Sequence, residues 1–472
     1  MTGVTLPTCR CRPASPLAGG PIVRCWKFLF PALLLSMLLP AAAQALNVKA
    51  FPAPKGEEVW YVADHKLPMI ALTAALPAGS AYDPEDRAGL ANFAAQMLDE
   101  GAGSLRSDAF QTALSNRAIR LSVSTERDWL VINLLTLSDN AKDAFELLGE
   151  ALSHPRFDPD AVARVRAQIL AGIAEDDEDP ADVAQKGFYR IWFGGSAYAH
   201  PIDGDKESLS RIEPSDLHRF AATHWVRRGL RIAVAGDVDE NRLGALLASA
   251  FGDLPAVARR APALAPHRPG PALTVIAMPV PQSTAVFGLP GILRSDPHYL
   301  AAYIANYIVG GGGFASRLTD EIREKRGLTY DITTSLESWH RTGLVLGQVA
   351  AQRGAMKQTL AAIRSTLRNF ARNGPTDTEV ADAKTYLTGS YPLSFGSNAD
   401  IADQLNVFER SGLTLDYVRN RNALMNAVTV DEVKKAARRL FDPSRMRVVV
   451  AGGLGGLPPA DASTETPSST AK

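Results

Sequence analysis

The sequence lacks cysteine everywhere except in its first 45 residues. Its three cysteines are Cys9, Cys11 and Cys25, and none occurs in the rest of the 472-residue chain. Once a leader of that length is removed, the protein has no thiol. Disulfide bonds, thiolate nucleophiles and cysteine-ligated metals are therefore excluded together.

Histidine is also scarce and scattered. None of the eight histidines lies three or four residues from another, and the closest pair, His218 and His224, is six residues apart. Two histidines one helical turn apart are a common way for a protein to begin a zinc site. The sequence offers no such pair.

The most apolar run is too short to cross a membrane, which takes about 20 residues. This run, Phe28 to Leu39, follows Arg24 and Lys27, contains Pro31, and is followed by Ala43-Gln44-Ala45. A short apolar run behind positive charge, closed by an Ala-x-Ala site, is typical of a secretory signal peptide. We therefore predict a signal peptide at residues 1–45, a periplasmic or otherwise exported protein, and no transmembrane segment in the mature chain.

Neither sign of charge dominates the composition. The chain has 50 Lys and Arg and 50 Asp and Glu, and removal of the leader takes away four basic residues and no acidic one. The mature chain is mildly acidic, which argues against a nucleic-acid partner. Its 46% apolar and 21% charged residues indicate an ordinary globular protein. Its length predicts more than one domain.

Two distant stretches of the chain resemble each other. Residues Glu213 to Gly236 align without a gap with Thr429 to Gly452, at a constant offset of 216. Each stretch has an acidic helix start, an amphipathic helix, an aromatic residue (Trp225 or Phe441) and an apolar strand that ends in Ala-Gly. This match predicts an internal duplication of the chain.

Strand-like runs occur in pairs within each half, at residues 59–76, 120–135, 273–289 and 330–349. Paired strands mixed with longer helical patterns favour an α+β fold, with an antiparallel or mixed sheet in each half and helices packed on one face. A proline-rich stretch separates the halves and polar, Gly/Pro/Ser-rich sequence ends the chain. The predicted organisation is an N-terminal domain at 46–254, a linker at 255–271, a C-terminal domain at 272–455 and a disordered tail at 456–472.

The segment Gly89 to Leu98, which reads GLANFAAQML, resembles the first helix of zinc peptidases of the insulinase/pitrilysin family. The resemblance is to the branch that includes the mitochondrial processing peptidases and their bacterial relatives. The family pattern is G-L-x-H-x-x-E-H-x-L, in which two histidines bind zinc and the glutamate polarises the attacking water. Asn92, Ala95 and Gln96 occupy those three positions here. Counting back from Pro180 places the family's third ligand, a glutamate, at Gly172.

Two nearby features do not rebuild a metal site. The acidic run Glu175 to Asp179 lacks a paired histidine set, so we interpret it as a solvated helix end. His200 stands in an Ala-His-Pro sequence that the family often has in a loop, and we interpret it as structural. The resemblance therefore implies a member without metal and without a catalytic residue of its own.

The segment Phe314 to Tyr330 resembles a second family motif, S-R-L-x-x-x-[LI]-R-x-x-x-G-L-x-Y. In the family, its Arg and Tyr hold the substrate against the zinc centre; the matching residues are Arg323 and Tyr330. We expect a helix from Ser316 to Lys325 that ends at Gly327, followed by a strand at 329–335. Taken singly, the two residues would be interpreted as a surface charge and a half-buried strand aromatic.

Glycine is concentrated immediately before that segment, at residues 310–313. No Gly-Lys-Ser/Thr follows, so a phosphate-binding loop is not indicated. A loop at the rim of a substrate cavity is the better interpretation.

Together these features predict two homologous domains that enclose a substrate cavity. The resemblance implies a non-catalytic, substrate-binding subunit of an exported heterodimeric zinc metallopeptidase, which would contribute Arg323 and Tyr330 to a partner's active site. The expected partners are a zinc-bearing subunit of the same family and a peptide substrate, and the zinc would belong to the partner. The alternative is a non-hydrolytic peptide-binding or scaffold protein of an envelope complex.

Overall fold

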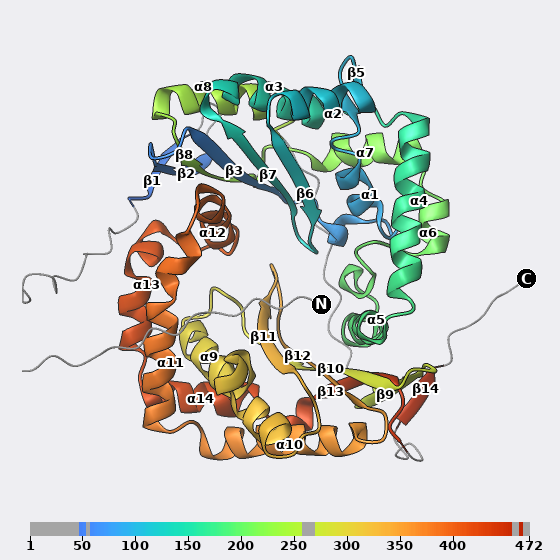
Figure 1. Ribbon diagram of the computed structural model, residues 1–472, viewed down its shortest axis with the longest axis vertical. Helices are drawn as coiled ribbons and strands as arrows, with labels where there is room; N and C mark the ends of the chain where they lie inside the picture. The colour runs from blue at the N-terminus through green and yellow to red at the C-terminus, as the bar shows by residue number, and fades with distance from the viewer. Residues whose placement is uncertain (1–46, 53–56, 257–269, 456–461, 466–472) are drawn as a thin grey trace, which may run out of the picture. The chain divides into compact units, whose positions relative to one another are not determined.

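The computed structural model describes residues 47–52, 57–256, 270–455 and 462–465, all within the compact unit Leu46–Lys472 (Figure 1). The signal peptide predicted at 1–45 and most of the linker predicted at 255–271 lie outside the described residues. No helix in the described part of the chain is both long enough and apolar enough to span a bilayer.

The N-terminal half contains a six-stranded mixed sheet with the order β1-β2-β8-β3-β7-β6. Only β2 and β8 are parallel neighbours; the other pairs are antiparallel. A separate two-stranded ribbon is formed by β4 and β5. The strands are β1 (Lys49–Pro52), β2 (Glu58–Ala63), β3 (Met69–Leu76), β4 (Gly101–Ala102), β5 (Leu105–Arg106), β6 (Arg120–Thr125), β7 (Leu130–Leu137) and β8 (Arg231–Gly236).

The C-terminal half repeats this sheet. Its order is β11-β12-β10-β13-β9-β14, so β9-β13-β10-β12-β11 reproduces β2-β8-β3-β7-β6 strand for strand. The parallel pair also recurs, as β9 with β13. The strands are β9 (Leu273–Ala277), β10 (Gln282–Pro290), β11 (Ile332–Ser338), β12 (Gly343–Gln352), β13 (Arg447–Gly452) and β14 (Ala462–Glu465). The common topology confirms the duplication.

The repeated helix-and-strand unit keeps the offset seen in the sequence. Helix α7 (Pro214–His224) leads into β8, and α14 (Val430–Leu440) leads into β13, with every boundary 216 residues apart. Trp225 and Phe441, which follow the two helices, are both fully buried. Each aromatic residue therefore packs in the core at the turn between its helix and its strand.

One part of the predicted disordered tail is ordered. Strand β14 pairs in parallel with β9 through a register that begins with Ala462 opposite Leu273. Strand β9 would otherwise be the sheet edge, and its unpaired backbone groups provide a template for another strand. The other residues of 456–472 lie outside the described part of the chain.

Each half packs its own helices against one face of its sheet, as the pattern predicts (Figure 1). In the N-terminal half these helices are α1 (Leu90–Gln96), α2 (Ser107–Asn116), α3 (Ala141–Ser153), α4 (Pro159–Asp176), α6 (Lys206–Ser210), α7 and α8 (Glu240–Phe251). In the C-terminal half they are α9 (Tyr299–Asn306), α10 (Met356–Asn373), α11 (Asp377–Gly389) and α14. Helix α13 (Leu415–Ala427) packs on α11 and contributes Val418 to the apolar cluster on the N-terminal sheet.

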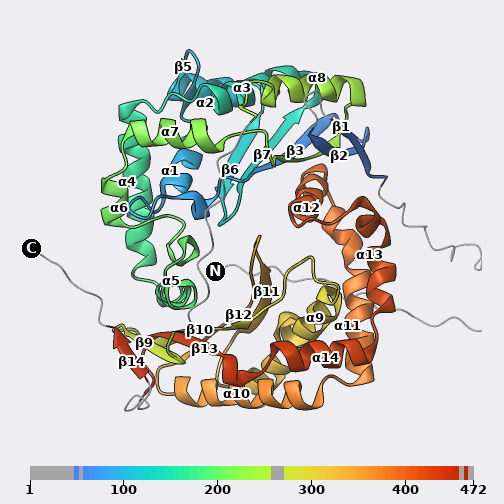
Figure 2. The same cartoon turned by 180° about the vertical axis from the view of Figure 1, so that it is seen from behind.

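The second face of each sheet is covered by a helix from the other half. Helix α5 (Pro180–Phe193) packs on β10 and β13 of the C-terminal sheet, and α12 (Asn398–Arg410) packs on β3 and β8 of the N-terminal sheet. Figures 1 and 2 show both crossings from opposite sides. The sequence predicts helices on one face only, because periodicity does not reveal which sheet a helix covers.

Glycine permits the close approach of α5 to its sheet. A Cβ atom at Gly187 would lie 2.7 Å from the Cδ1 atom of Ile276, and one at Gly288 would lie 2.4 Å from the Cζ atom of Phe188. Phe188 is completely buried and stacks on Trp192, with ring centroids 5.5 Å apart. A larger residue at Gly288 would require the buried ring of Phe188 to move, and one at Gly187 would require the end of the Ile276 side chain to shift.

Helix α12 brings polar side chains into its buried contact. Asn406 donates from Nδ2 to the backbone oxygens of Thr73, at 3.2 Å, and of Arg231, at 3.0 Å. Glu409 is only 4% exposed, and Arg231 is the cation that faces its carboxyl group, at 3.8 Å. Burial raises the pKa of Glu409 to about 8; Arg231 and the backbone N–H of Ile232 oppose the rise, and Glu58 adds to it.

We predict that this buried carboxyl makes stability depend on pH. Because the folded-state pKa lies above the unfolded value, the folded chain keeps a proton that the unfolded chain has already released between about pH 4.5 and 8. Its contribution is complete below that window and is lost as pH rises through it. Urea unfolding measures the free energy of unfolding at pH 6 and at pH 8.5. The decrease between these two pH values should be about 2 kcal/mol larger in the parent than in Glu409→Gln. Equal pH dependence in both proteins would contradict this assignment.

Candidate functional site

The helix that matches the family's zinc helix is retained as a packing element. Asp83 accepts hydrogen bonds from the backbone N–H groups of Gly89, at 2.8 Å, and Ala91, at 2.7 Å, at the start of α1. Gly89 has a φ of 90°, and a Cβ there would lie 2.6 Å from the backbone oxygen of Asp203. Phe93 on the same helix is fully buried in the core. The motif's glycine therefore sets the contact between α1 and the Asp203 loop.

The side chains at the zinc-ligand positions do not fit a zinc ion. Asn92 is buried and donates from Nδ2 to the Oδ1 atom of Asp203, at 2.8 Å. Ala95 is buried without any ligand atom, and Gln96 is exposed at the end of α1. Gly172 on α4 faces open space, and a Cβ atom added there would have no described neighbour within 4 Å. Imidazole and carboxylate ligands are thus absent from all of these positions.

The described residues contain no group of three or more His, Cys, Asp or Glu side chains that could hold a metal ion. The acidic run that follows Gly172 has structural partners instead: Lys186 lies 3.3 Å from Asp176 and 3.1 Å from Asp177, and Asp179 caps α5 through the N–H of Ala181. These contacts agree with a helix end. The backbone oxygen of His200 accepts a hydrogen bond from Arg127, at 3.2 Å, which is a structural role.

The Arg/Tyr segment is not the regular helix that the sequence predicts. Two π-helical turns, η4 (Tyr307–Gly311) and η6 (Thr319–Glu324), flank the short 3-10 helix η5 (Gly313–Ala315). The N–H of Lys325 donates a hydrogen bond to the backbone oxygen of Asp320, at 2.9 Å, and this bond closes the wide turn of η6. Gly327 has a φ of 62° and ends the segment, as predicted. A π turn shifts the direction of the side chains that follow, and such turns occur frequently at functional sites.

The S-R-L part of the motif anchors this segment. Ser316 and Leu318 are fully buried. Arg317 forms a two-point ion pair with Glu379 of α11, at 2.6 Å for each contact, and its guanidinium lies 5.0 Å from the centroid of the Phe370 ring. Burial alone would raise the pKa of Glu379, but the hydrogen bonds from Arg317 and Thr376 outweigh it and lower the pKa to about 2. Sequence reasoning missed this role of Arg317, although its bidentate geometry is the arrangement that arginine favours.

Arg323 lies on the anchored segment and stays accessible. Its guanidinium lies 4.4 Å from the ring centroid of Phe314, and its Nε is 3.5 Å from the Oε1 atom of Glu324. About a third of its side chain is exposed, and Phe314 is 73% exposed. The aromatic partner was not predicted; its place directly after the glycine run was the only signal.

Tyr330 is 85% exposed and precedes the strand rather than beginning it, because β11 starts at Ile332. The backbone beside it is fixed by Thr329, whose hydroxyl donates to the oxygen of Ala350, at 2.6 Å. In the described part of the chain, no hydrogen bond or ring contact joins Tyr330 to Arg323. Convergence of the two side chains on one peptide group stays a prediction.

The hairpin that follows Tyr330 is fastened to the N-terminal half. Trp339, at the hairpin tip, contacts the rings of Tyr189, Phe193 and Tyr198 with centroid distances of 5.6 to 6.2 Å. The N–H of His340 donates to the Oδ2 atom of Asp128, at 2.8 Å. Strand β11 therefore connects the exposed tyrosine to a fixed contact between the halves.

Comparison with known proteins defines the class of this chain. Residues 59–206 match the family model described as insulinase (peptidase family M16), and residues 211–387 match the model described as peptidase M16 inactive domain. A solved structure of a peptidase M16 inactive domain from Pseudomonas fluorescens is 30% identical, with a TM-score of 0.82, and covers 88% of this chain and 100% of its own. The chain belongs to the insulinase family.

Two further relatives indicate which kind of family member this chain is. A protein named non-peptidase homolog YmxG, from Helicobacter pylori (strain ATCC 700392 / 26695), is 28% identical over 422 residues, which is 88% of this chain and 96% of the relative. The beta subunit of the mitochondrial-processing peptidase from Blastocladiella emersonii is 23% identical over 396 residues, covering 81% of this chain and 84% of the relative. With its replaced zinc ligands, this chain is an inactive-type member of the family.

We predict that the zinc site can be rebuilt only as a complete set. The variant carrying Asn92→His, Ala95→Glu, Gln96→His and Gly172→Glu should bind about one zinc ion per chain, because α1 keeps the motif's spacing and the space at Gly172 is open. The parent and each single variant should bind none above background. Elemental analysis after dialysis measures the zinc content. Zinc bound stoichiometrically by the parent or by Asn92→His alone would show that the site is misplaced.

Proposed function

We propose that this chain is the non-catalytic, substrate-binding subunit of an exported heterodimeric zinc metallopeptidase. The observation that carries the proposal is an accessible arginine and an exposed tyrosine held on an anchored segment, in a chain whose zinc-ligand positions contain Asn92, Gln96 and Gly172. The partner would be a zinc-bearing member of the same family. The signal-peptide pattern of residues 1–45 supports export.

The chemistry of the two side chains suits this role. Arg323 can donate hydrogen bonds to a peptide carbonyl, since its pair with the exposed Glu324 is weak in water. The Tyr330 hydroxyl can donate to the oxyanion that forms when the peptide carbonyl is attacked. Zinc held by the partner would supply polarisation of the carbonyl and of the attacking water.

The alternative is a protein that binds peptides, or assembles an envelope complex, without hydrolysis. The loss of every zinc ligand favours it, as does similarity to a relative named as a non-peptidase homolog. The two proposals differ in what they require of Arg323 and Tyr330. A scaffold has no need of a hydroxyl that donates to an oxyanion.

We predict that changes at Tyr330 and at Arg323 affect different kinetic constants of the assembled enzyme. In the two-chain complex, Tyr330→Phe should lower kcat by about 100- to 1000-fold, because it removes one oxyanion donor and almost no volume. Arg323→Ala should raise KM by about tenfold or more, because a charged hydrogen bond to the peptide is lost. Peptide hydrolysis measures both constants, and gel filtration shows whether the complex assembles.

The chain offers matched controls for both changes. Tyr386 is 58% exposed and stacks on Tyr307, so Tyr386→Phe keeps its ring contact and removes only a hydroxyl. Arg326 is a nearby surface arginine paired with Glu321, at 2.6 Å. Tyr386→Phe and Arg326→Ala should leave kcat and KM unchanged. If Tyr330→Phe and Arg323→Ala assemble and cleave like the parent, the subunit role is wrong and the scaffold role replaces it.

A further inference from the structure

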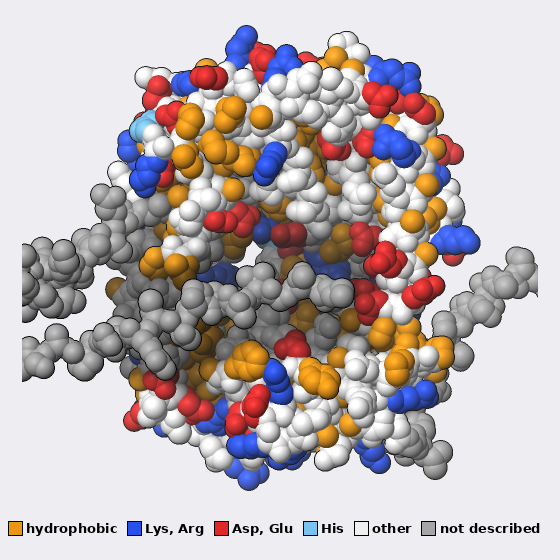
Figure 3. All heavy atoms as spheres, in the orientation of Figure 1, with side chains coloured by type: hydrophobic (Ala, Val, Ile, Leu, Met, Phe, Trp, Pro, Cys, Tyr) orange, Lys and Arg blue, Asp and Glu red, His pale blue; other side chains and the backbone are white. Residues whose placement is uncertain are grey.

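Helix α10 carries a row of like charges. It contains Lys357, Arg364, Arg368 and Arg372 and no acidic residue. The three arginines are spaced four residues apart, so they lie along one side of the helix and repel each other. Figure 3 shows blue side chains along the edge where Figure 1 places α10.

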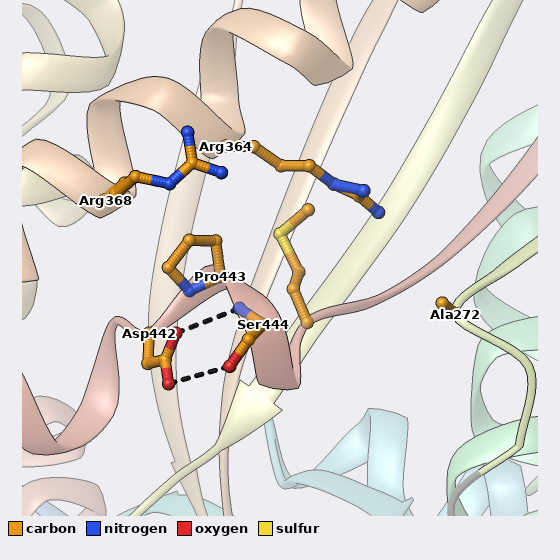
Figure 4. A pocket seen from close by; sticks show the side chains of 7 residues that line it. Ala272, Arg364, Arg368, Asp442, Pro443 and Ser444 are labelled. Atoms are coloured by element: carbon orange, nitrogen blue, oxygen red, sulfur yellow. Dashed lines mark hydrogen bonds between the residues drawn. The ribbon is translucent and has the colours of Figure 1, made fainter.

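Two of these arginines line a pocket with a volume of about 330 Å³, within the size range of small-molecule sites. Both side chains extend from α10 beside the short helix η8 (Pro443–Arg445), as Figure 4 shows. The lining combines these two cations with polar and apolar groups: Ala272, Arg364, Arg368, Asp442, Pro443, Ser444 and Met446.

Arg364 has an unsatisfied donor in this pocket. Its Nε atom is shielded from solvent and has no hydrogen-bond partner among the described residues. Burial lowers the pKa of Arg364, and the neighbouring charge of Arg368 lowers it further. Neither arginine forms an ion pair with any described acid. A shielded guanidinium N–H without an acceptor is unfavourable, and an anion in the pocket would supply that acceptor.

The carboxylate in the pocket does not neutralise Arg364. Asp442 accepts hydrogen bonds from the backbone N–H of Ser444, at 3.0 Å, and from its hydroxyl, at 2.8 Å. These two bonds lower the pKa of Asp442, with smaller contributions from Arg445 and Arg368. The carboxylate is thus ionised but directed to its own turn, and the pocket keeps one positive charge in excess.

We propose that this pocket binds a phosphate ester, with the phosphate between Arg364 and Arg368 and the organic part against Pro443 and Met446. Two guanidinium groups suit the charge and the several acceptor oxygens of a phosphate. None of these residues belongs to the segment that carries Arg323 and Tyr330, so the site is separate from the proposed function. The ester can be a soluble metabolite-sized molecule or the headgroup of a phospholipid.

The test uses sn-glycerol 3-phosphate as the soluble probe, titrated calorimetrically into the purified chain at constant ionic strength. Arg364→Gln and Arg368→Gln should each weaken binding by about tenfold or more, since each loses charged hydrogen bonds. Arg372→Gln removes the same charge one turn further along α10, outside the pocket, and should change binding by less than about twofold. Because none of the three side chains is fully buried, circular dichroism should show folded variants.

A second arm distinguishes the two sources of the phosphate. Vesicles of phosphatidylglycerol and phosphatidylcholine, compared with vesicles of phosphatidylcholine alone, are sedimented with the parent and the three variants. Sedimentation that requires Arg364 and Arg368 but not Arg372, without soluble binding, supports the proposal with a lipid headgroup as the ligand. Soluble binding with the same dependence supports a free ester. Absence of both, or equal loss in all three variants, overturns the proposal.

Discussion

The exchange of α5 and α12 between the two halves is the contact on which the rest of the structure depends. Each sheet has one face covered by its own helices and one face covered by a helix of the other half. The central strands are therefore apolar on both faces, which is why β8 and β13 are almost completely buried. Neither half could bury its sheet alone. Because Trp339 docks at the same contact, the exchange also fixes the hairpin that follows Tyr330.

The anchored segment separates structural from accessible residues within one motif. Ser316, Arg317 and Leu318 are buried or paired, whereas Arg323 and Tyr330 are left accessible. In the N-terminal half, by contrast, only the structural residues of the motif are kept. Helix α1 has the motif's glycine and the core-facing Phe93, but not the side chains that would bind metal. The fold thus explains why the helix persists without its chemistry, since α1 fills the core.

The sequence predicted the elements that depend on local pattern, and missed those that depend on distant contacts. The 216-residue offset predicted α7, β8, α14 and β13 correctly, because amphipathic helices and apolar strands have distinct periods. It did not predict that α5 and α12 each pack on the sheet of the other half, since the apolar face of a helix does not indicate which sheet it covers. The π turn around Arg323 was also missed, because a run of good helix formers does not show whether its hydrogen bonds close over four residues or five. The lost zinc site was predictable, since it depends on residue identity alone.

We propose that hydrolysis requires two chains, one with zinc and one with the Arg/Tyr segment. The most direct measurement is the kcat/KM of peptide cleavage by a zinc-bearing family member from the same cell, alone and with increasing amounts of this chain. If so, neither chain cleaves appreciably by itself, and activity rises to a plateau at equal amounts of the two. Full activity of the zinc-bearing chain alone, with no change when this chain binds to it, would contradict a two-chain enzyme.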